Sequence, residues 1–260
     1  MSRAISTLMR KAFIGVVAGV ALLAAGPTRA DEALVAVAAN FAGAVEAITA
    51  EFSKDTGHSV QITTGATGKL YAQISEGAPF AILLSADAKT PAKLEEEGMA
   101  VSGSRFTYAI GRLSLWSPDL ARIGQDPRAA LTASDTLYVA IANPELAPYG
   151  VAAREALTAM GLWDTIQPKV VMGQNIGQTF SLADTGAAQM GFVATSAVQG
   201  PGISPRGSRY DVPQDMFSPI RQDAVLLKAG EGNSAAIAFM DYLESARAKA
   251  IIRSFGYDTE

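Results

Sequence analysis

Short apolar runs alternate with amphipathic segments along the chain from residue 33 to its end. The run at 33–39 is rich in alanine and valine, which is typical of a buried strand, and residues 41–55 then repeat large apolar side chains at helical spacing. Asn40 stands between the two and is a good candidate for the cap of that helix. The same reasoning predicts strands at 58–63, 81–86, 108–117, 137–144, 168–173, 188–196 and 223–229, and helices at 69–77, 90–98, 150–161, 177–186 and 233–256.

This alternation predicts an α/β protein in which parallel sheets carry helices on both faces. In such folds a ligand binds where strands end and helices begin. Small, polar or glycine-containing turns occupy such junctions at 40–41, 65–68, 148–150 and 175–177. Two of these turns lie in the first third of the chain and two in the last half, which suits a site shared by two lobes.

The four turns have the chemistry of an anion site. A helix start offers unpaired backbone N–H groups and a partial positive charge. The Thr67 hydroxyl, the Asn40 amide and the Tyr149 phenol add neutral donors, and none of the turns contains a carboxylate that could accept a proton from the ligand. A protonated phosphate would leave its O–H unpaired there, so the turns favour a sulfate-like or molybdate-like dianion.

The first thirty residues have the three-part pattern of a secretory signal peptide. A basic start is followed by an apolar run at 12–26 and by small residues around a cleavage site after Ala30. The alternative is an N-terminal membrane anchor, for which the apolar run is short. Cleavage would remove four basic and no acidic residues, which changes the formal net charge from −4 to −8. We therefore expect an exported protein whose main partner is neither nucleic acid nor an anionic membrane.

The composition excludes several kinds of site. The chain has no cysteine and one histidine, His58, so disulfides, thiolate metal sites and zinc sites built on several histidines are excluded. A hydrolase triad would have to use His58 as its base, and no nucleophile motif accompanies that residue. An α/β hydrolase or transferase is the alternative from another functional class.

Several sequence blocks together resemble one family, the periplasmic molybdate-binding proteins that serve ABC importers. The resemblance covers nearly all of the chain after residue 30, including AVAANFAGAVEAITAEF, TTGATGKLYAQISEG, ANPELAPYGVAAREAL and VVMGQNIGQTFSLADTGAAQMGFVATSAV. It implies a hinged, two-lobed fold that closes on molybdate or tungstate without a cofactor. It also implies a monomer in the periplasm that delivers its ligand to a membrane permease. Another tetrahedral oxyanion such as sulfate is the alternative ligand.

The resemblance also implies the ligand-binding positions. Carried over residue by residue, the ligands are Asn40, Thr67, Tyr149 and the backbone N–H of Ile176, with further backbone contacts from Ala39, Ala66 and Asn175. Tyr149 would supply the phenol that some members place later, near Ala194. The chain departs from the usual residues of the family at Ala81, Gln174 and Gly177.

We expect each lobe to be a mostly parallel sheet flanked by helices, with two strands crossing between the lobes. The predicted lobe one contains residues 31–110 and 224–260, because the last strand and helix should return to the first sheet. The predicted lobe two contains residues 111–223.

Overall fold

The computed structural model describes residues 31–260, so the predicted signal peptide at 1–30 lies outside the described residues. The strands are β1 (Glu32–Ala38), β2 (Ser59–Gly65), β3 (Ile82–Leu84), β4 (Phe106–Gly111), β5 (Leu113–Ser117), β6 (Val139–Ala142), β7 (Val170–Gly173), β8 (Met190–Ala194), β9 (Ser208–Asp211) and β10 (Ile220–Leu226). The α-helices are α1 (Ala42–Thr56), α2 (Thr67–Ser75), α3 (Lys89–Glu96), α4 (Pro127–Thr132), α5 (Pro148–Ala159), α6 (Trp163–Ile166), α7 (Ile176–Asp184), α8 (Ser234–Leu243) and α9 (Ala246–Ser254). Short 3₁₀ turns, η1 (Ala39–Phe41), η2 (Gln167–Lys169), η3 (Thr195–Ala197), η4 (Gln214–Met216) and η5 (Lys228–Gly230), complete the set.

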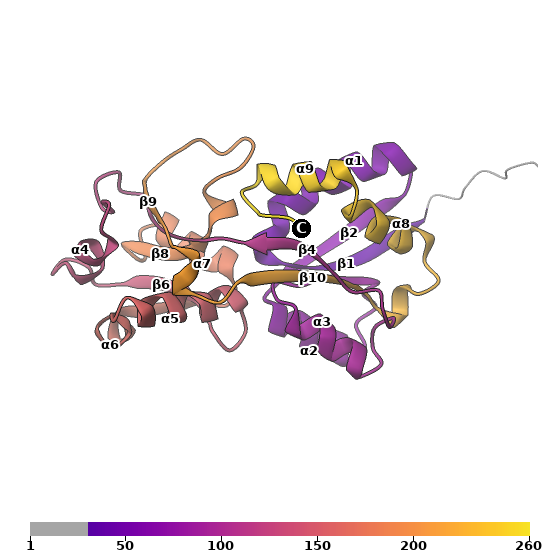
Figure 1. Cartoon of the computed structure of the whole chain (residues 1–260), viewed down its shortest axis with the longest axis horizontal. Coiled ribbons are helices and arrows are strands. Elements are labelled where there is room, and N and C mark those ends of the chain that lie inside the picture. Colours follow the sequence, from indigo (N-terminus) through magenta and orange to yellow (C-terminus); the bar gives the residue numbers. More distant parts are fainter. Residues whose placement is uncertain (1–30) are drawn as a thin grey trace, which may run out of the picture.

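The strands form two five-stranded sheets, each the centre of one lobe (Figure 1). The first sheet has the order β2-β1-β3-β10-β4, and the second has the order β7-β6-β8-β5-β9. In each sheet the first three strands are parallel to one another and the last two join antiparallel. The sheets are therefore mixed, because each receives strands that arrive from, or leave for, the other lobe.

Two stretches of chain cross between the lobes. The apolar run at 108–117, expected as one strand, is divided at Arg112 into β4 of the first sheet and β5 of the second. β10 follows the last strand of the second sheet in sequence and inserts between β3 and β4 of the first. β4 of the first sheet continues to Gly111, beyond the predicted lobe limit at 110, and β10 of the same sheet begins at Ile220, before the predicted limit at 224. The lobe limits stay a prediction.

Alternating side chains of each sheet enter separate apolar cores. Val35 and Val37 of β1 pack under α1, α8 and α9, whereas Ala36 between them faces α2 and α3. The second sheet packs α4, α5 and α6 on one face and α7 on the other, where Trp116 and Val193 lie. Burial on both faces explains why these strands are continuously apolar in sequence.

Some elements differ from the sequence-based expectation. Asn40 does not cap α1: the chain first makes η1, and the α1 start has no side-chain cap. The helix expected at 233–256 is two helices, because the Ser245 hydroxyl accepts a hydrogen bond from the Ala248 N–H and starts α9. β9, α4 and α6 lack a strong periodic pattern and were not expected. Within residues 31–260, no helix is both long and apolar enough to cross a membrane.

Candidate functional site

The four turns identified in the sequence meet at one small cavity between the two sheets. Its volume is about 10 Å³, far below the roughly 300–1,000 Å³ of a pocket for a drug-sized molecule. A cavity of this size suits one compact ion and is too small for a sugar, nucleotide or peptide. It is lined by Ala38, Ala39, Asn40, Gly65, Ala66, Thr67, Ala86, Ala147, Pro148, Tyr149, Asn175 and Ile176. None of these side chains is charged.

The ends of β1, β2, β6 and β7 supply the turns, and the helices that follow start at the cavity. η1 and α1 follow β1, α2 follows β2, α5 follows β6 and α7 follows β7. The backbone N–H groups of a first helical turn have no carbonyl partner within their own helix, and the helix dipole makes this end positive. Four helix starts around an uncharged cavity form an environment that stabilises a small anion.

Thr67 and Tyr149 both line the cavity and are buried, and each carries a hydroxyl. The Thr67 oxygen accepts a hydrogen bond from the Ala86 N–H at 3.1 Å, so its own proton is free to point elsewhere. The Tyr149 oxygen accepts from Gln222 Nε2 at 3.3 Å. Burial, together with the nearby Tyr257 phenol, raises the pKa of Tyr149 well above its usual value. Tyr149 is therefore a neutral donor over the physiological pH range.

Asn40 is used differently from the expectation based on its amide. Its Nδ2 donates to Gln222 Oε1 at 2.8 Å and to the Tyr257 oxygen at 3.1 Å. Both amide protons are consequently used inside the protein, while the buried Asn40 Oδ1 has no hydrogen-bond partner within residues 31–260. In this arrangement Asn40 can offer a ligand its backbone N–H, which lies in η1.

The remaining expected positions also lie at the cavity. The Asn175 side chain caps α7 by accepting a hydrogen bond from the Gln178 N–H at 2.8 Å, and Ile176 is the first residue of that helix. Ala39 and Ala66 also line the cavity. Ala194, at the end of β8, is buried and is not among the lining residues.

Hydrogen bonds close the two lobes around the cavity. The Gly68 N–H of α2 donates to the Leu146 carbonyl oxygen, ahead of α5, at 2.9 Å. On another side the Ser196 hydroxyl donates to the Asn40 carbonyl oxygen at 3.1 Å. The Tyr257 hydroxyl lies within hydrogen-bond distance of both that carbonyl oxygen, at 2.6 Å, and Ser196 Oγ, at 2.9 Å. In this structure the two lobes are therefore in direct contact on two sides of the cavity.

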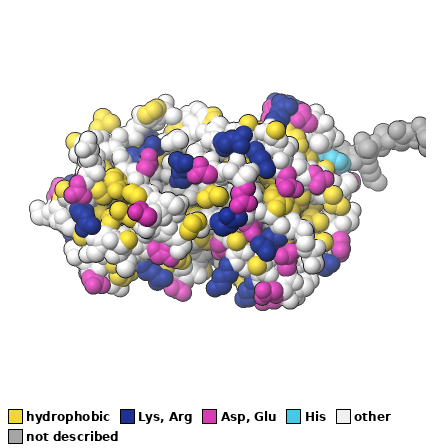
Figure 2. Space-filling view, in the orientation of Figure 1, with side chains coloured by type: hydrophobic (Ala, Val, Ile, Leu, Met, Phe, Trp, Pro, Cys, Tyr) yellow, Lys and Arg dark blue, Asp and Glu magenta, His cyan; other side chains and the backbone are white. Residues whose placement is uncertain are grey.

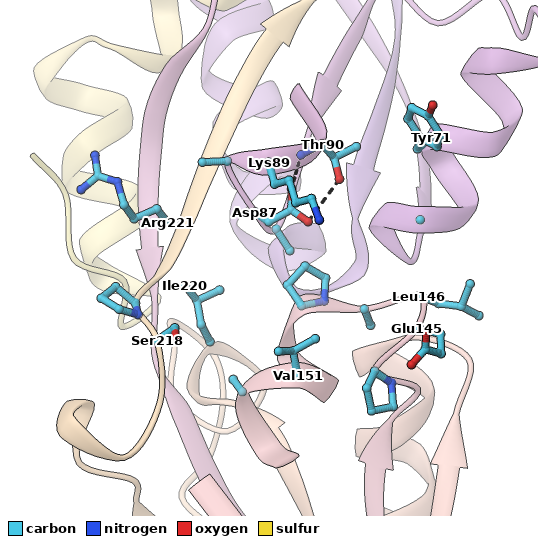
Figure 3. Close-up of a pocket in the computed structure, with 18 of the residues that line it drawn as sticks. Tyr71, Asp87, Lys89, Thr90, Glu145, Leu146, Val151, Ser218, Ile220 and Arg221 are labelled. Carbon is cyan, nitrogen blue, oxygen red and sulfur yellow. Dashed lines mark hydrogen bonds between the residues drawn. The ribbon is translucent and has the colours of Figure 1, made fainter. Parts of the chain in front are cut away.

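A larger groove of about 540 Å³ opens beside the cavity, between α2, α3 and α5 (Figure 3). It shares Ala86, Ala147 and Pro148 with the cavity. Two of its carboxylates have partners within the protein: Asp87 accepts from the Thr90 N–H at 2.7 Å, and Glu155 accepts from the Ser218 N–H at 2.7 Å. The groove is wide and carries charged side chains such as Lys89 and Glu145, whereas the cavity is small and uncharged and is where the four helix starts meet. We therefore take the cavity as the functional site.

His58, the one base available to a hydrolase triad, lies away from the cavity. His58 lies at the start of β2, where its Nδ1 accepts a hydrogen bond from the Asp31 N–H at 3.1 Å, and it does not line the cavity. Residues 31–260 contain no group of three or more His, Cys, Asp or Glu that could hold a metal ion.

Two crossing stretches, two sheets and a small ligand cavity between them define the architecture of a hinged solute-binding protein. The family described as "Bacterial extracellular solute-binding protein" matches residues 33–258, and the chain belongs to it. The family is one of binding proteins, which confirms the expectation of a binding protein rather than a hydrolase or transferase.

Several similar proteins have more specific names than the family. The chain is 48% identical over 247 residues to the molybdate-binding protein ModA of Rhodobacter capsulatus, covering 95% of this chain and 94% of the relative. It is 46% identical over 239 residues to ModA of Azotobacter vinelandii, covering 92% and 94%. The solved structure of the Azotobacter vinelandii periplasmic molybdate-binding protein matches with a TM-score of 0.84 and 39% identity, covering 88% of this chain and 99% of that one. The two-lobed α/β fold is confirmed.

The sequence alone did not identify Gln222, Tyr257 and Ser196, which hold the site residues in place. Gln222 is 182 residues from Asn40 in sequence, and Tyr257 is 217 residues away. Neither lies at a turn from a strand into a helix, the pattern that predicts the other site residues. The one available hint was the polar pair Gln222 and Asp223, which stands directly before the apolar end of the last strand.

Proposed function

We propose that this protein binds molybdate as an intact dianion in the cavity between its lobes and delivers it to the membrane permease of an ABC importer. The observation that carries the proposal is the convergence of four helix starts on a small cavity lined without a charged side chain. The relatives named as molybdate-binding proteins, which the chain matches over more than nine-tenths of its length, support the choice of oxyanion.

The ligand positions we propose are Asn40, Thr67, Tyr149 and Ile176. Thr67 and Tyr149 donate through their hydroxyls, and Ile176 donates through its backbone N–H. Asn40 donates through its backbone N–H as well, because its amide protons are bonded to Gln222 and Tyr257. Backbone groups of Ala39, Ala66 and Asn175 complete the shell.

The donor set suits a dianion that carries no proton at neutral pH. No carboxylate or free imidazole lines the cavity, so a protonated phosphate would have a buried O–H without an acceptor. Tungstate has the same charge and shape as molybdate, and we propose that it binds too. Sulfate has the same charge and is smaller, so its oxygens reach fewer donors at once.

A calorimetric titration of the protein lacking residues 1–30 with molybdate, tungstate, sulfate, phosphate and chromate tests the proposal. We expect submicromolar binding of molybdate and tungstate and sulfate binding at least ~100-fold weaker, a difference of roughly 2.7 kcal/mol. Equal titrations of sulfate and molybdate would refute the selectivity and leave an oxyanion site. Binding of none of the five anions would refute the proposed function.

The N-terminal sequence pattern and the charge distribution support proposals about where the protein acts and in what form. We propose that residues 1–30 direct export to the periplasm, where the protein acts as a monomer with lobes at 31–110 plus 224–260 and 111–223. Figure 2 shows basic and acidic side chains interspersed over one face of the molecule, without a continuous basic patch. With the acidic net charge, this supports a protein that does not bind nucleic acid.

A further inference from the structure

We propose that Gln222 is a positioning residue of the anion site: its buried amide joins Asn40 of one lobe to Tyr149 of the other and directs the Tyr149 proton into the cavity. The inference rests on the proposed function and deepens it. Gln222 does not line the cavity, and no feature of the four helix starts points to it.

Gln222 lies on the strand that returns from the second lobe to the first. Its side chain is 0% exposed. The pairing of β10 with β4 shifts register between Gln222 and Asp223, so that Tyr108 of β4 has no opposite residue. Such a bulge changes the direction of nearby side chains and allows a strand to turn a polar group towards a site. Here the two side chains concerned, Gln222 and Tyr108, meet behind the cavity.

The Gln222 amide contacts both lobes at once. Its Oε1 accepts a hydrogen bond from Asn40 Nδ2 at 2.8 Å, and its Nε2 donates to the Tyr149 oxygen at 3.3 Å. This contact requires a glycine at position 111. A Cβ added at Gly111 would lie 2.3 Å from the Tyr149 oxygen and 2.6 Å from Gln222 Nε2.

The direction of this amide decides what Tyr149 offers to an anion. While Gln222 Nε2 donates to the Tyr149 oxygen, the single phenol proton is free to point into the cavity. If the amide turned by 180°, Oε1 would take that proton, and Tyr149 would present only lone pairs to the anion. The heavy atoms would barely move, yet an attractive contact would become a repulsive one.

Asn40 holds the amide in the productive direction. Its Nδ2 needs acceptors, which Gln222 Oε1 and the Tyr257 oxygen provide, while the Tyr257 proton is directed to the Asn40 carbonyl or Ser196. Tyr108 is compatible with this direction, because its hydroxyl lies within donating distance of both Gln222 Oε1, at 3.1 Å, and the Ser85 carbonyl oxygen, at 2.8 Å. Contacts among these residues therefore set which group donates and which accepts in each hydrogen bond. Gln222 extends this order to Tyr149, because its Nε2 donates to the Tyr149 oxygen.

The test is a double-mutant cycle between Gln222→Met and Tyr149→Phe, read by calorimetric titration with molybdate. Methionine keeps the length of glutamine and removes both hydrogen-bonding groups. We expect Gln222→Met to weaken molybdate binding about tenfold in the parent chain and less than about threefold in the Tyr149→Phe background. A residue that only shaped the crossing strand would cost the same factor in both backgrounds, and that result would overturn the inference.

Gln189→Met is the matched control, because Gln189 Oε1 accepts hydrogen bonds from the Leu137 and Tyr138 N–H groups away from the cavity. It should leave molybdate affinity unchanged. If Gln222→Met does not fold, Gln222→Glu keeps the shape and can only accept from Tyr149, so its loss of affinity should again be smaller with Tyr149→Phe. An unchanged affinity in Gln222→Met would overturn the inference and leave the proposed function standing. A parent chain that ignores molybdate would overturn both.

Discussion

Closure of the two lobes depends on a close approach at Gly68, and the variant Gly68→Ala separates closure from folding. The Gly68 N–H donates to the Leu146 carbonyl oxygen at 2.9 Å across the lobes. A Cβ at position 68 would lie 3.2 Å from that oxygen and 3.3 Å from the Leu146 Cα, tighter than an ordinary contact. Both neighbours are backbone atoms of the other lobe, so they cannot move aside as a flexible side chain could.

The substitution should change stability and affinity in opposite directions. Gly68 is the second residue of α2, where alanine is favoured over glycine by about 0.5–1 kcal/mol. The closed form would lose a hydrogen bond worth about 0.5–1.5 kcal/mol and would be pushed apart at the contact. We therefore expect molybdate affinity to fall about tenfold, about 1.4 kcal/mol, while the free energy of unfolding without ligand stays equal or rises.

Calorimetric titration and urea unfolding of the same preparation measure the two quantities, and small-angle X-ray scattering with and without molybdate reports how far the lobes close. Gly232→Ala is the control, because a Cβ there meets nothing within 4 Å. Parent-like affinity in Gly68→Ala would show that this approach of α2 to Leu146 does not limit closure, and the reasoning would be wrong.

Three further predictions concern the hydroxyls of the site. Tyr149→Phe should weaken molybdate binding about ten- to a hundredfold, since a hydrogen bond to a charged group is worth roughly 1.5–3 kcal/mol. The control Ile176→Val keeps the backbone donor and should bind like the parent. An unaffected Tyr149→Phe would place that hydroxyl outside the ligand shell. Molybdate affinity measured from about pH 6 to 9 should be flat, because burial keeps the pKa of Tyr149 above this range and no other titratable side chain lines the cavity; a marked change would reveal an ionisable group that acts on the ligand. Burial also raises the pKa of Tyr257 to about 12, whereas an unfolded tyrosine ionises near pH 10. The unfolded chain therefore releases this proton first, so the urea-derived free energy of unfolding should fall between about pH 10 and 12, and less steeply in Tyr257→Phe; equal slopes would contradict the assignment.

The local pattern of residues determined much of this protein. Apolar runs ending in small or polar turns predicted most strands and helices, since a strand buried on both faces must be continuously apolar and a helix must start where its N–H groups find partners. The same turns predicted which residues surround the cavity, because strand ends and helix starts are fixed by nearest neighbours in the chain. Asn40, Thr67, Tyr149 and Ile176 all line it, and their binding role stays a prediction.

Only the tertiary structure decided how these residues are held. Asn40 reads as a helix cap in sequence, but its amide is buried against Gln222 and Tyr257, 182 and 217 residues away, so packing overrides the local preference. Likewise Gly111 looks like an interruption in a strand, and its lack of a side chain makes room for the Tyr149 hydroxyl. Contacts between distant segments depend on how the two sheets are connected and how closely the lobes approach each other. A short-range pattern of residues does not encode which distant segments will meet.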